Sequence, residues 1–127
     1  MPSNLDDKEK RKLIGFSYAW NGLAEIAKSE RNFRIHLLAT VLVILVGVFV
    51  KLSFMEWMIV FLAIGLVFVA ETTNTAIEKL IDCLRPDIHP SIKAIKDIAA
   101  GAVLIAAITA FIIGCLLFIP KLYNMVI

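Results

Sequence analysis

The sequence is poor in the residues on which small secreted domains and soluble enzymes depend. Of its 127 residues, two are cysteine, four are proline and six are glycine, and only 19% are charged. Two cysteines are too few for a disulfide framework or a zinc site. The chain has neither a glycine-rich phosphate loop nor a His/Cys metal-ligand spacing. The net charge of +2 argues against nucleic acid as a partner, and the charged first 35 residues argue against a cleavable signal peptide.

What the sequence has instead is apolar surface. Hydrophobic residues make up 60% of the chain, and its mean hydropathy is +0.85. A soluble fold of this size could not bury so much apolar surface, which excludes a typical cytosolic enzyme and a disordered chain. We therefore expect an all-α membrane protein that forms a single membrane-embedded domain over residues 1–127. It should have an N-terminal amphipathic surface helix followed by three transmembrane helices.

The first 28 residues are polar or amphipathic. Residues 1–10 carry five charges and are expected to form a loose tail. Over residues 11–28, apolar side chains recur at steps of three and four, which places them on one helical face. They are Leu13, Phe16, Trp20, Leu23 and Ala27. This pattern predicts a helix lying on the membrane surface; the alternative is an ordinary helix packed on its own protein.

Three apolar runs follow, and the second, residues 57–70, is too short to cross a hydrocarbon core of about 30 Å. Its helix must therefore continue through the polar residues 71–78, and no helix-breaking residue occurs before Pro86. Pro120 is expected to end the third helix. The expected helices that contain the spans are 35–50, 57–84 and 98–119.

Lysine and arginine are distributed unevenly along the chain. Seven of the thirteen precede residue 35, four surround the second loop, and one each stands in the first loop and near the C-terminus. Cytoplasmic loops carry an excess of these residues. We therefore expect the N-terminus and the second loop in the cytoplasm, and the first loop and the C-terminus outside the cell membrane.

Glu71 is the most informative residue. It lies about 21 Å along the second span, counted from Trp57 at about 1.5 Å per residue, and so inside the hydrocarbon on its cytoplasmic side. An ionisable residue at that depth is costly and usually carries function. The alternative is a buried structural carboxyl paired with a neighbour such as Lys96. Four further polar residues continue the same helical stripe. They are Asn74, Thr75, Glu78 and Asp82.

Other charged residues should meet this stripe at the cytoplasmic face. Glu30 and Glu78 offer hard oxygen ligands, which suit Mg²⁺ together with phosphate oxygens, and Lys96 could steady a phosphate. Glu71, partly withdrawn from water, is a candidate general base. The combination indicates phosphoryl transfer to the hydroxyl of a membrane lipid. In more ordinary interpretations, Lys96 anchors its helix at the interface and Asp97 is a helix N-terminal charge.

Two other classes of function remain as alternatives. An oligomeric ion pathway built on Glu71 would need polar residues through the whole membrane depth, and residues 57–70 supply none. A scaffold subunit that binds a larger enzyme would not require Glu30, Glu78 and Lys96 to gather at one depth.

These residues together resemble a known family. Glu71-Thr-Thr-Asn74-Thr-Ala-Ile-Glu78, then Asp82, then Lys96-Asp97, with Glu30-Arg-Asn-Phe-Arg34 upstream, is similar to the small bacterial diacylglycerol kinases. The resemblance implies homotrimers of three-span subunits with a surface helix, in the bacterial cell membrane. It also implies ATP- and Mg²⁺-dependent phosphorylation of a membrane lipid alcohol, at sites shared between subunits.

The resemblance implies a role for each matching residue. Glu71 corresponds to the general base, Glu30 and Glu78 correspond to the carboxylates that bind Mg²⁺, and Asn74 corresponds to a polar active-site residue. The ATP-contacting positions are Arg11, Tyr18, Glu30, Glu78, Asp87, Ile88, His89, Lys96 and Asp97. The lipid-contacting positions are Arg11, Glu71 and Ala100.

The expected lipid follows from the branch of the family. Residues 30–37 and 97–101 resemble the Gram-positive branch, which is known for phosphorylating undecaprenol, whereas the Gram-negative branch has a serine near Ala100. Undecaprenol is therefore the expected substrate and diacylglycerol the alternative. His36, at the lipid boundary, is expected to be structural or interfacial, with a substrate contact as the alternative.

Overall fold

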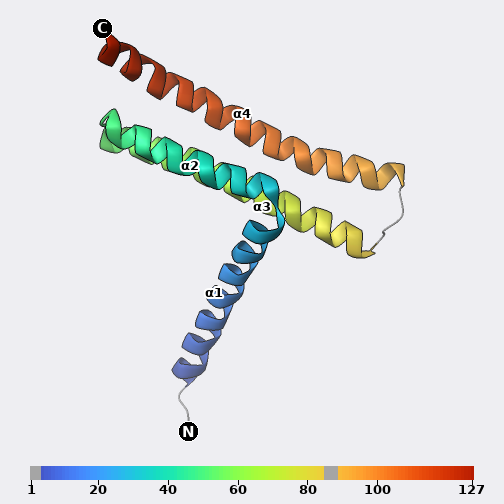
Figure 1. Cartoon of the computed structure of the whole chain (residues 1–127). Helices are drawn as coiled ribbons and strands as arrows, with labels where there is room; N and C mark the ends of the chain where they lie inside the picture. The colour runs from blue at the N-terminus through green and yellow to red at the C-terminus, as the bar shows by residue number, and fades with distance from the viewer. Residues whose placement is uncertain (1–3, 85–88) are drawn as a thin grey trace. The chain divides into compact units, whose positions relative to one another are not determined.

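The computed structural model describes the backbone of residues 4–84 and 89–127, with side chains from residue 7 onward. Every element in these residues is an α-helix, which confirms the predicted all-α class for the described chain. The helices are α1 (Asn4–Ser29), α2 (Arg31–Phe49), α3 (Phe54–Leu84) and α4 (Pro90–Val126) (Figure 1). The chain divides into two compact units, residues 1–31 and residues 32–127, which are described separately.

The N-terminal unit is built on α1. This helix begins at Asn4, so the prediction that residues 1–10 form a loose tail was wrong for residues 4–10. The physical reason is that no proline or glycine occurs between Ser3 and Gly15, and the segment is rich in good helix formers such as Lys, Glu and Leu. Leu13, Phe16, Trp20 and Leu23 of α1 are exposed, Trp20 by 67%, whereas Ile26 near the end of the helix is buried. The exposed side chains form an uncovered apolar face of the kind that a surface helix lays on lipid.

The turn between α2 and α3 has a defined hydrogen-bond pattern. The amide of Leu52 donates to the carbonyl of Gly47 and that of Lys51 to Val48, at 3.1 and 3.2 Å, which is a Schellman ending. Lys51 adopts a φ of 58°, the left-handed conformation that this ending requires. α3 then starts with a capping box, in which Ser53 and Glu56 exchange backbone-to-side-chain hydrogen bonds of 2.8 and 3.2 Å.

The core of the C-terminal unit lies where this turn meets the far end of α4. Val50, Leu52 and Val60 are buried there and pack against Trp57 and Phe118. Further along, α3 and α4 pack on each other. The buried apolar residues along these two helices are small or branched, which allows helix backbones to approach closely. Beyond Val60, they are Ala63, Val67, Ala99 and Ala106.

The helices extend beyond the predicted ranges at several ends. α2 begins at Arg31 instead of residue 35, and α3 at Phe54 instead of residue 57. α4 begins at Pro90 instead of residue 98, because proline suits the first helical turn and His89 caps it, accepting at 3.2 Å from the Ser91 amide. The prediction that Pro120 ends the third helix was wrong, since α4 runs to Val126. Proline removes one hydrogen bond there, which helices tolerate in membrane segments.

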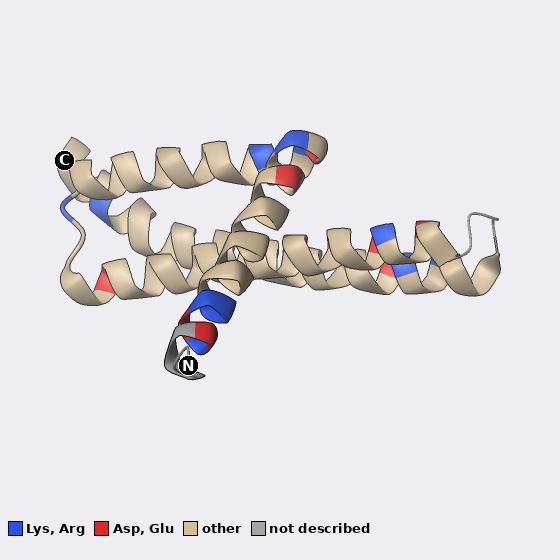
Figure 2. Cartoon of the chain, turned by 90° about the horizontal axis from the view of Figure 1, so that it is seen from below, with Lys and Arg blue, Asp and Glu red and all other residues tan. Residues whose placement is uncertain are grey.

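Three helices, α2, α3 and α4, are long and apolar enough to cross a membrane. Figure 2 shows that the charges on α3 and α4 gather toward the helix ends and leave an uncharged stretch between them. One end carries Glu56, paired at 3.1 Å with Lys121. The other end carries the polar stripe that begins at Glu71, so the fold places the candidate site at the end where α3 stops and α4 starts.

Candidate functional site

The candidate site is built around Glu71, in the second half of α3. Glu71 is only 3% exposed, and Thr75, one turn further along the helix, is buried as well. Among the residues that the structure describes, Glu71 and Thr75 are the two polar or charged residues that are buried. Because α3 is continuous to Leu84, the stripe from Glu71 to Asp82 forms on one helix as predicted. A helix that can span a membrane thus carries a buried acidic side chain.

His36 of α2 is one partner of Glu71. Its Nε2 lies 3.9 Å from Glu71 Oε2, and the side chains of the two residues are 26% and 4% exposed. Phe68 of α3 positions this ring, with its centroid 6.5 Å from that of His36 and 5.2 Å from that of Phe33. The sequence placed His36 at the lipid boundary but did not pair it with Glu71. The depth count would have indicated the pairing, because both residues lie inside spans near the same end.

Asn74 and Glu78 form the second pair of the stripe. Asn74 Nδ2 donates to Glu78 Oε1 at 3.4 Å, a long hydrogen bond. Asn74 Oδ1 is buried and has no hydrogen-bond partner among the described residues. A buried acceptor without a partner costs free energy, which a bound ligand could recover.

The Asn74–Glu78 pair fits a divalent cation. It offers hard carboxylate and amide oxygens, and Mg²⁺ takes only one or two protein carboxylates and completes its shell with water and substrate phosphates. The described residues contain no cluster of three or more His, Cys, Asp or Glu able to hold a metal by themselves. Glu30 lies between α1 and α2 in the N-terminal unit, so its joint action with Glu78 stays a prediction.

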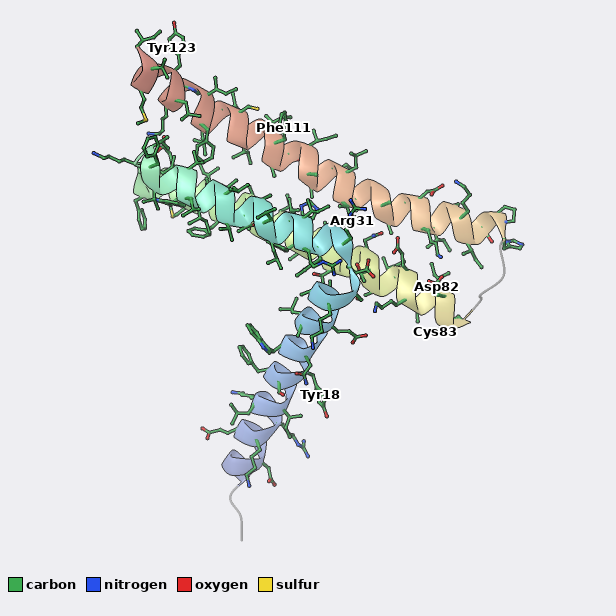
Figure 3. The ribbon with its side chains drawn as sticks, viewed as in Figure 1. Tyr18, Arg31, Asp82, Cys83, Phe111 and Tyr123 are labelled. Atoms are coloured by element: carbon green, nitrogen blue, oxygen red, sulfur yellow. The ribbon has the colours of Figure 1, made fainter. Side chains whose placement is uncertain are left out.

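Lys96 joins α4 to the end of the stripe. Its Nζ lies 2.6 Å from Asp82 Oδ1, and Asp82 stands near the end of α3 beside the exposed Cys83 (Figure 3). Lys96 therefore pairs with Asp82 and not with Glu71, which was the alternative interpretation of Glu71. A phosphate would compete with Asp82 for the Lys96 ammonium, which carries three N–H donors.

Asp97 is paired on its own helix. Its Oδ2 accepts from Lys93 Nζ at 2.6 Å, one turn away. The interpretation of Asp97 as a helix N-terminal charge was wrong, because α4 begins at Pro90 and Asp97 lies about two turns inside it. Both Asp97 and Lys93 are exposed, so this pair contributes little to stability.

The remaining predicted site residues are spread over the chain. Arg11 and Tyr18 are exposed on α1, in the N-terminal unit, and their approach to Glu71 stays a prediction. Asp87 and Ile88 lie outside the described residues. His89 caps α4, and Ala100 is exposed on the same helix two turns after Lys93.

Fold and site together define a multi-pass α-helical membrane protein with a buried carboxylate near one membrane face. Comparison with known proteins then gives the family. The sequence model of the prokaryotic diacylglycerol kinases matches residues 17–118. The chain belongs to the prokaryotic diacylglycerol kinase family.

Individual relatives support this assignment. The chain is 45% identical to the undecaprenol kinase of Bacillus subtilis over 123 residues, which cover 93% of this chain and 100% of the relative. It is 38% identical to a diacylglycerol kinase of Synechocystis sp. over 91% of this chain and 66% of that protein. It is 30% identical to the diacylglycerol kinase of Escherichia coli (strain K12) over 79% and 82% of the two chains. The family is one of lipid kinases, so the predicted enzyme class is confirmed.

Proposed function

We propose that this chain transfers the γ-phosphate of ATP to the hydroxyl of a membrane lipid alcohol, with undecaprenol as the preferred substrate. The observation that carries the proposal is the Glu71 carboxylate, 3% exposed on a helix able to span a membrane. A base at that depth can meet a hydroxyl that stays in the bilayer. The 45% identity to an undecaprenol kinase over that relative's full length favours undecaprenol over diacylglycerol.

The reaction follows from the chemistry of the residues. Glu71 accepts the hydroxyl proton, the lipid oxygen bonds to the γ-phosphorus, and the bond from that phosphorus to the bridging oxygen breaks, leaving ADP. Glu30 and Glu78 would hold Mg²⁺ against the ATP phosphates, and the ion would neutralise charge on the transferring group. Asn74 Oδ1 is a further oxygen beside Glu78.

Other residues would bind the nucleotide and the lipid headgroup. Lys96 would meet a phosphate as a mobile point charge, in competition with Asp82. The proposed nucleotide contacts on the remaining elements are Arg11, Tyr18, Asp87, Ile88, His89 and Asp97. Arg11 and Ala100 are the proposed neighbours of the lipid head.

The proposed assembly is a homotrimer in the cell membrane, with the N-terminus in the cytoplasm and sites shared between subunits. The small residues Ala99 and Ala106 are buried within the chain. At Gly65 and Gly101, an added Cβ would meet no other atom within 4 Å. These two positions leave surfaces on which a second copy can pack closely.

The deciding experiment measures phosphate transfer by the purified protein in mixed micelles with labelled ATP and Mg²⁺. Undecaprenol and diacylglycerol are supplied in parallel at equal mole fraction. We expect a higher kcat/KM for undecaprenol. Preference for diacylglycerol would reverse the substrate assignment, and transfer to neither lipid would contradict the proposed function.

A further inference from the structure

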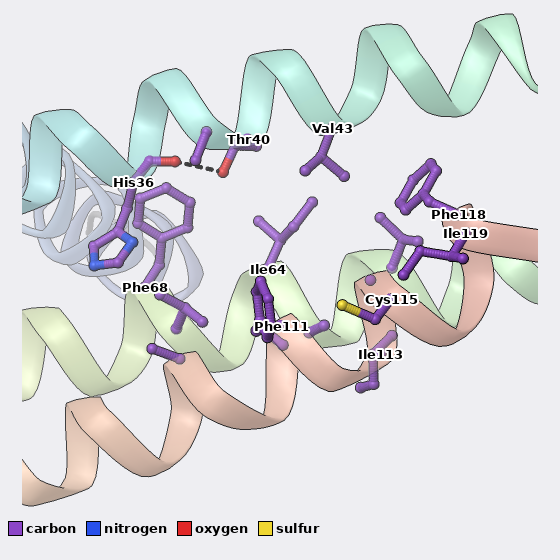
Figure 4. A pocket seen from close by; sticks show the side chains of 17 residues that line it. His36, Thr40, Val43, Ile64, Phe68, Phe111, Ile113, Cys115, Phe118 and Ile119 are labelled. Carbon is purple, nitrogen blue, oxygen red and sulfur yellow. Dashed lines mark hydrogen bonds between the residues drawn. The ribbon is translucent and has the colours of Figure 1, made fainter. Parts of the chain in front are cut away.

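An apolar cavity of 490 Å³ lies between the three spans of the C-terminal unit, and His36 stands at one of its ends (Figure 4). Apart from His36, Thr40 and Cys115, its lining side chains are apolar. The Thr40 hydroxyl donates a hydrogen bond of 2.8 Å to the backbone carbonyl of His36. Because the Thr40 hydroxyl is engaged and a thiol is a weak donor, the His36 ring is the polar group of the cavity wall best suited to bind a hydroxyl.

The cavity has the length and the opening that a lipid chain needs. Its α4 side runs from Ala107 to Ile119, which is about 18 Å at 1.5 Å per residue. That is more than half of a hydrocarbon core of about 30 Å. Phe111 and Ile119 line it and are nevertheless 73% and 60% exposed, so the cavity is open to the outside of the chain and is not sealed.

His36 at the end of the cavity and Glu71 beside it, which does not itself line the cavity, have the geometry of a hydroxyl site. His36 Nε2 and Glu71 Oε2 are 3.9 Å apart, which is too long for a direct hydrogen bond. Because this distance is less than twice a hydrogen-bond length of about 2.8 Å, one oxygen atom can bond to both at once. An alcohol placed there donates its proton to Glu71 and accepts from His36, in the tautomer that carries a proton on Nε2.

We propose that His36 and Glu71 hold the hydroxyl of the lipid alcohol between them, with the first hydrocarbon segment of the alcohol in the cavity that His36 borders. This inference rests on the proposed function and adds a substrate contact, His36, and a path for the chain. In transfer, the bound oxygen bonds to the γ-phosphorus, its proton passes to Glu71, and ADP leaves. His36 keeps its own proton and fixes the oxygen's orientation.

The hydroxyl contact is tested with His36→Ala and His36→Gln, because glutamine retains an N–H donor. Alanine should lower kcat/KM for the lipid by about tenfold or more, the size of one lost hydrogen bond to a substrate. The KM for ATP should stay within about twofold, since only lipid contacts are removed. Glutamine should recover most of the loss. Unchanged lipid kinetics in His36→Ala, or equal losses in both variants, would overturn the contact.

The chain path is tested at Gly114, which lines the cavity and where an added Cβ meets no atom within 4 Å. Gly114→Leu should raise the KM for a long prenol several-fold while a five-carbon prenol is affected less. Leu116→Phe is the matched control, since Leu116 is 71% exposed and does not line the cavity. Equal effects of Gly114→Leu and Leu116→Phe, or on both prenols, would overturn the path.

A photoreactive long-chain prenol provides a readout that does not depend on turnover. Labelling of the wild-type protein, mapped by mass spectrometry, should fall on cavity-lining residues of α4 and should be lost in Gly114→Leu. Labelling elsewhere, or crosslinks showing that a second copy fills the cavity, would overturn the inference while leaving the kinase function intact. Absence of phosphate transfer to either lipid by the wild-type protein would instead contradict the proposed function.

Discussion

Lys96 of α4 and Asp82 of α3 form an ion pair of 2.6 Å at the end of the candidate site. Their side chains are 36% and 63% exposed, and an exposed pair of this kind contributes about 1 kcal/mol or less. The contact is therefore weak enough for a phosphate to compete with it. Replacing Lys96 and Asp82 one at a time can decide whether Lys96 stabilises the fold or binds the nucleotide.

Removing the two partners one at a time should affect ATP binding differently. Lys96→Met should raise the KM for ATP by about tenfold or more, as expected when a charge-assisted contact to a phosphate is lost. Asp82→Asn should leave this KM unchanged or lower it, because a carboxylate no longer competes with the phosphate for Lys96. Steady-state kinetics with varied ATP measures both, with Lys121→Met as the control, since Lys121 pairs with Glu56 at the other end of the unit. Equal increases of KM in Lys96→Met and Asp82→Asn would assign the pair to the fold.

Replacing Glu71 should remove the general base but preserve the affinity for ATP. Glu71→Gln retains the side-chain volume and loses the ability to accept a proton, so turnover should fall by about 10²- to 10⁴-fold. Glu71→Asp should also be poor, since an error of about 1 Å in the position of a reacting group is costly. The measurement pairs lipid-kinase turnover with ATP affinity in one preparation, and affinity should change much less. Near-normal turnover in Glu71→Gln would make Glu71 structural.

The metal assignment makes Mg²⁺ dependence the readout for Glu30 and Glu78. Glu30→Gln and Glu78→Gln should each raise the Mg²⁺ concentration needed for half-maximal activity and reduce turnover, because an amide is a weaker ligand than a carboxylate. Glu56→Gln is the matched control, as Glu56 is engaged with Ser53 and Lys121 at the other end of the unit. A Mg²⁺ titration identical to wild type in both site variants would withdraw the assignment.

Orientation can be tested with single cysteines in a background where Cys83 and Cys115 are alanine. A membrane-impermeant thiol reagent should label a cysteine placed at Ser53 from outside the cell. It should label one placed at Ser91 only after the cell is opened, because lysine and arginine gather on the side of that loop. Both serines are exposed in the structure. The reverse pattern would place the site away from cytosolic ATP.

Gly47 should be intolerant of a methyl group. A Cβ there would lie 2.7 Å from Trp57 Cη2 and 2.9 Å from Leu52 Cδ1, and the Trp57 ring is also stacked on Phe61 at 5.6 Å. Gly47→Ala should therefore destabilise the fold by about 1–3 kcal/mol through overpacking. Gly15→Ala, where an added Cβ meets nothing within 4 Å beyond the backbone of its own helix, is the control. Detergent-titration unfolding compares them, and equal stability of the two variants would refute the close contact.

Much of the fold was predictable because the membrane leaves few solutions. A segment in hydrocarbon must satisfy its own backbone hydrogen bonds, so an apolar run becomes a helix. The continuity of α3 past Ala70 followed from the same constraint, and with it the stripe from Glu71 to Asp82. The ends of the helices were less predictable. α1 and α4 extend through polar residues 4–10 and 90–97, where helix propensity and the His89–Pro90 cap decide the boundary instead of hydropathy.

The sequence by itself determined that this protein is a helical membrane protein of the diacylglycerol kinase family, with an ionisable residue at the depth of Glu71. Periodicity, length and charge distribution are local properties, and they fix which residues share a helix and a face. Only the tertiary structure decided the partners across helices. His36 meets Glu71, Lys96 meets Asp82, and Ala99 and Ala106 are buried. Such contacts depend on how one helix is rotated and shifted against another, which side-chain packing along the whole interface sets and no single helix encodes.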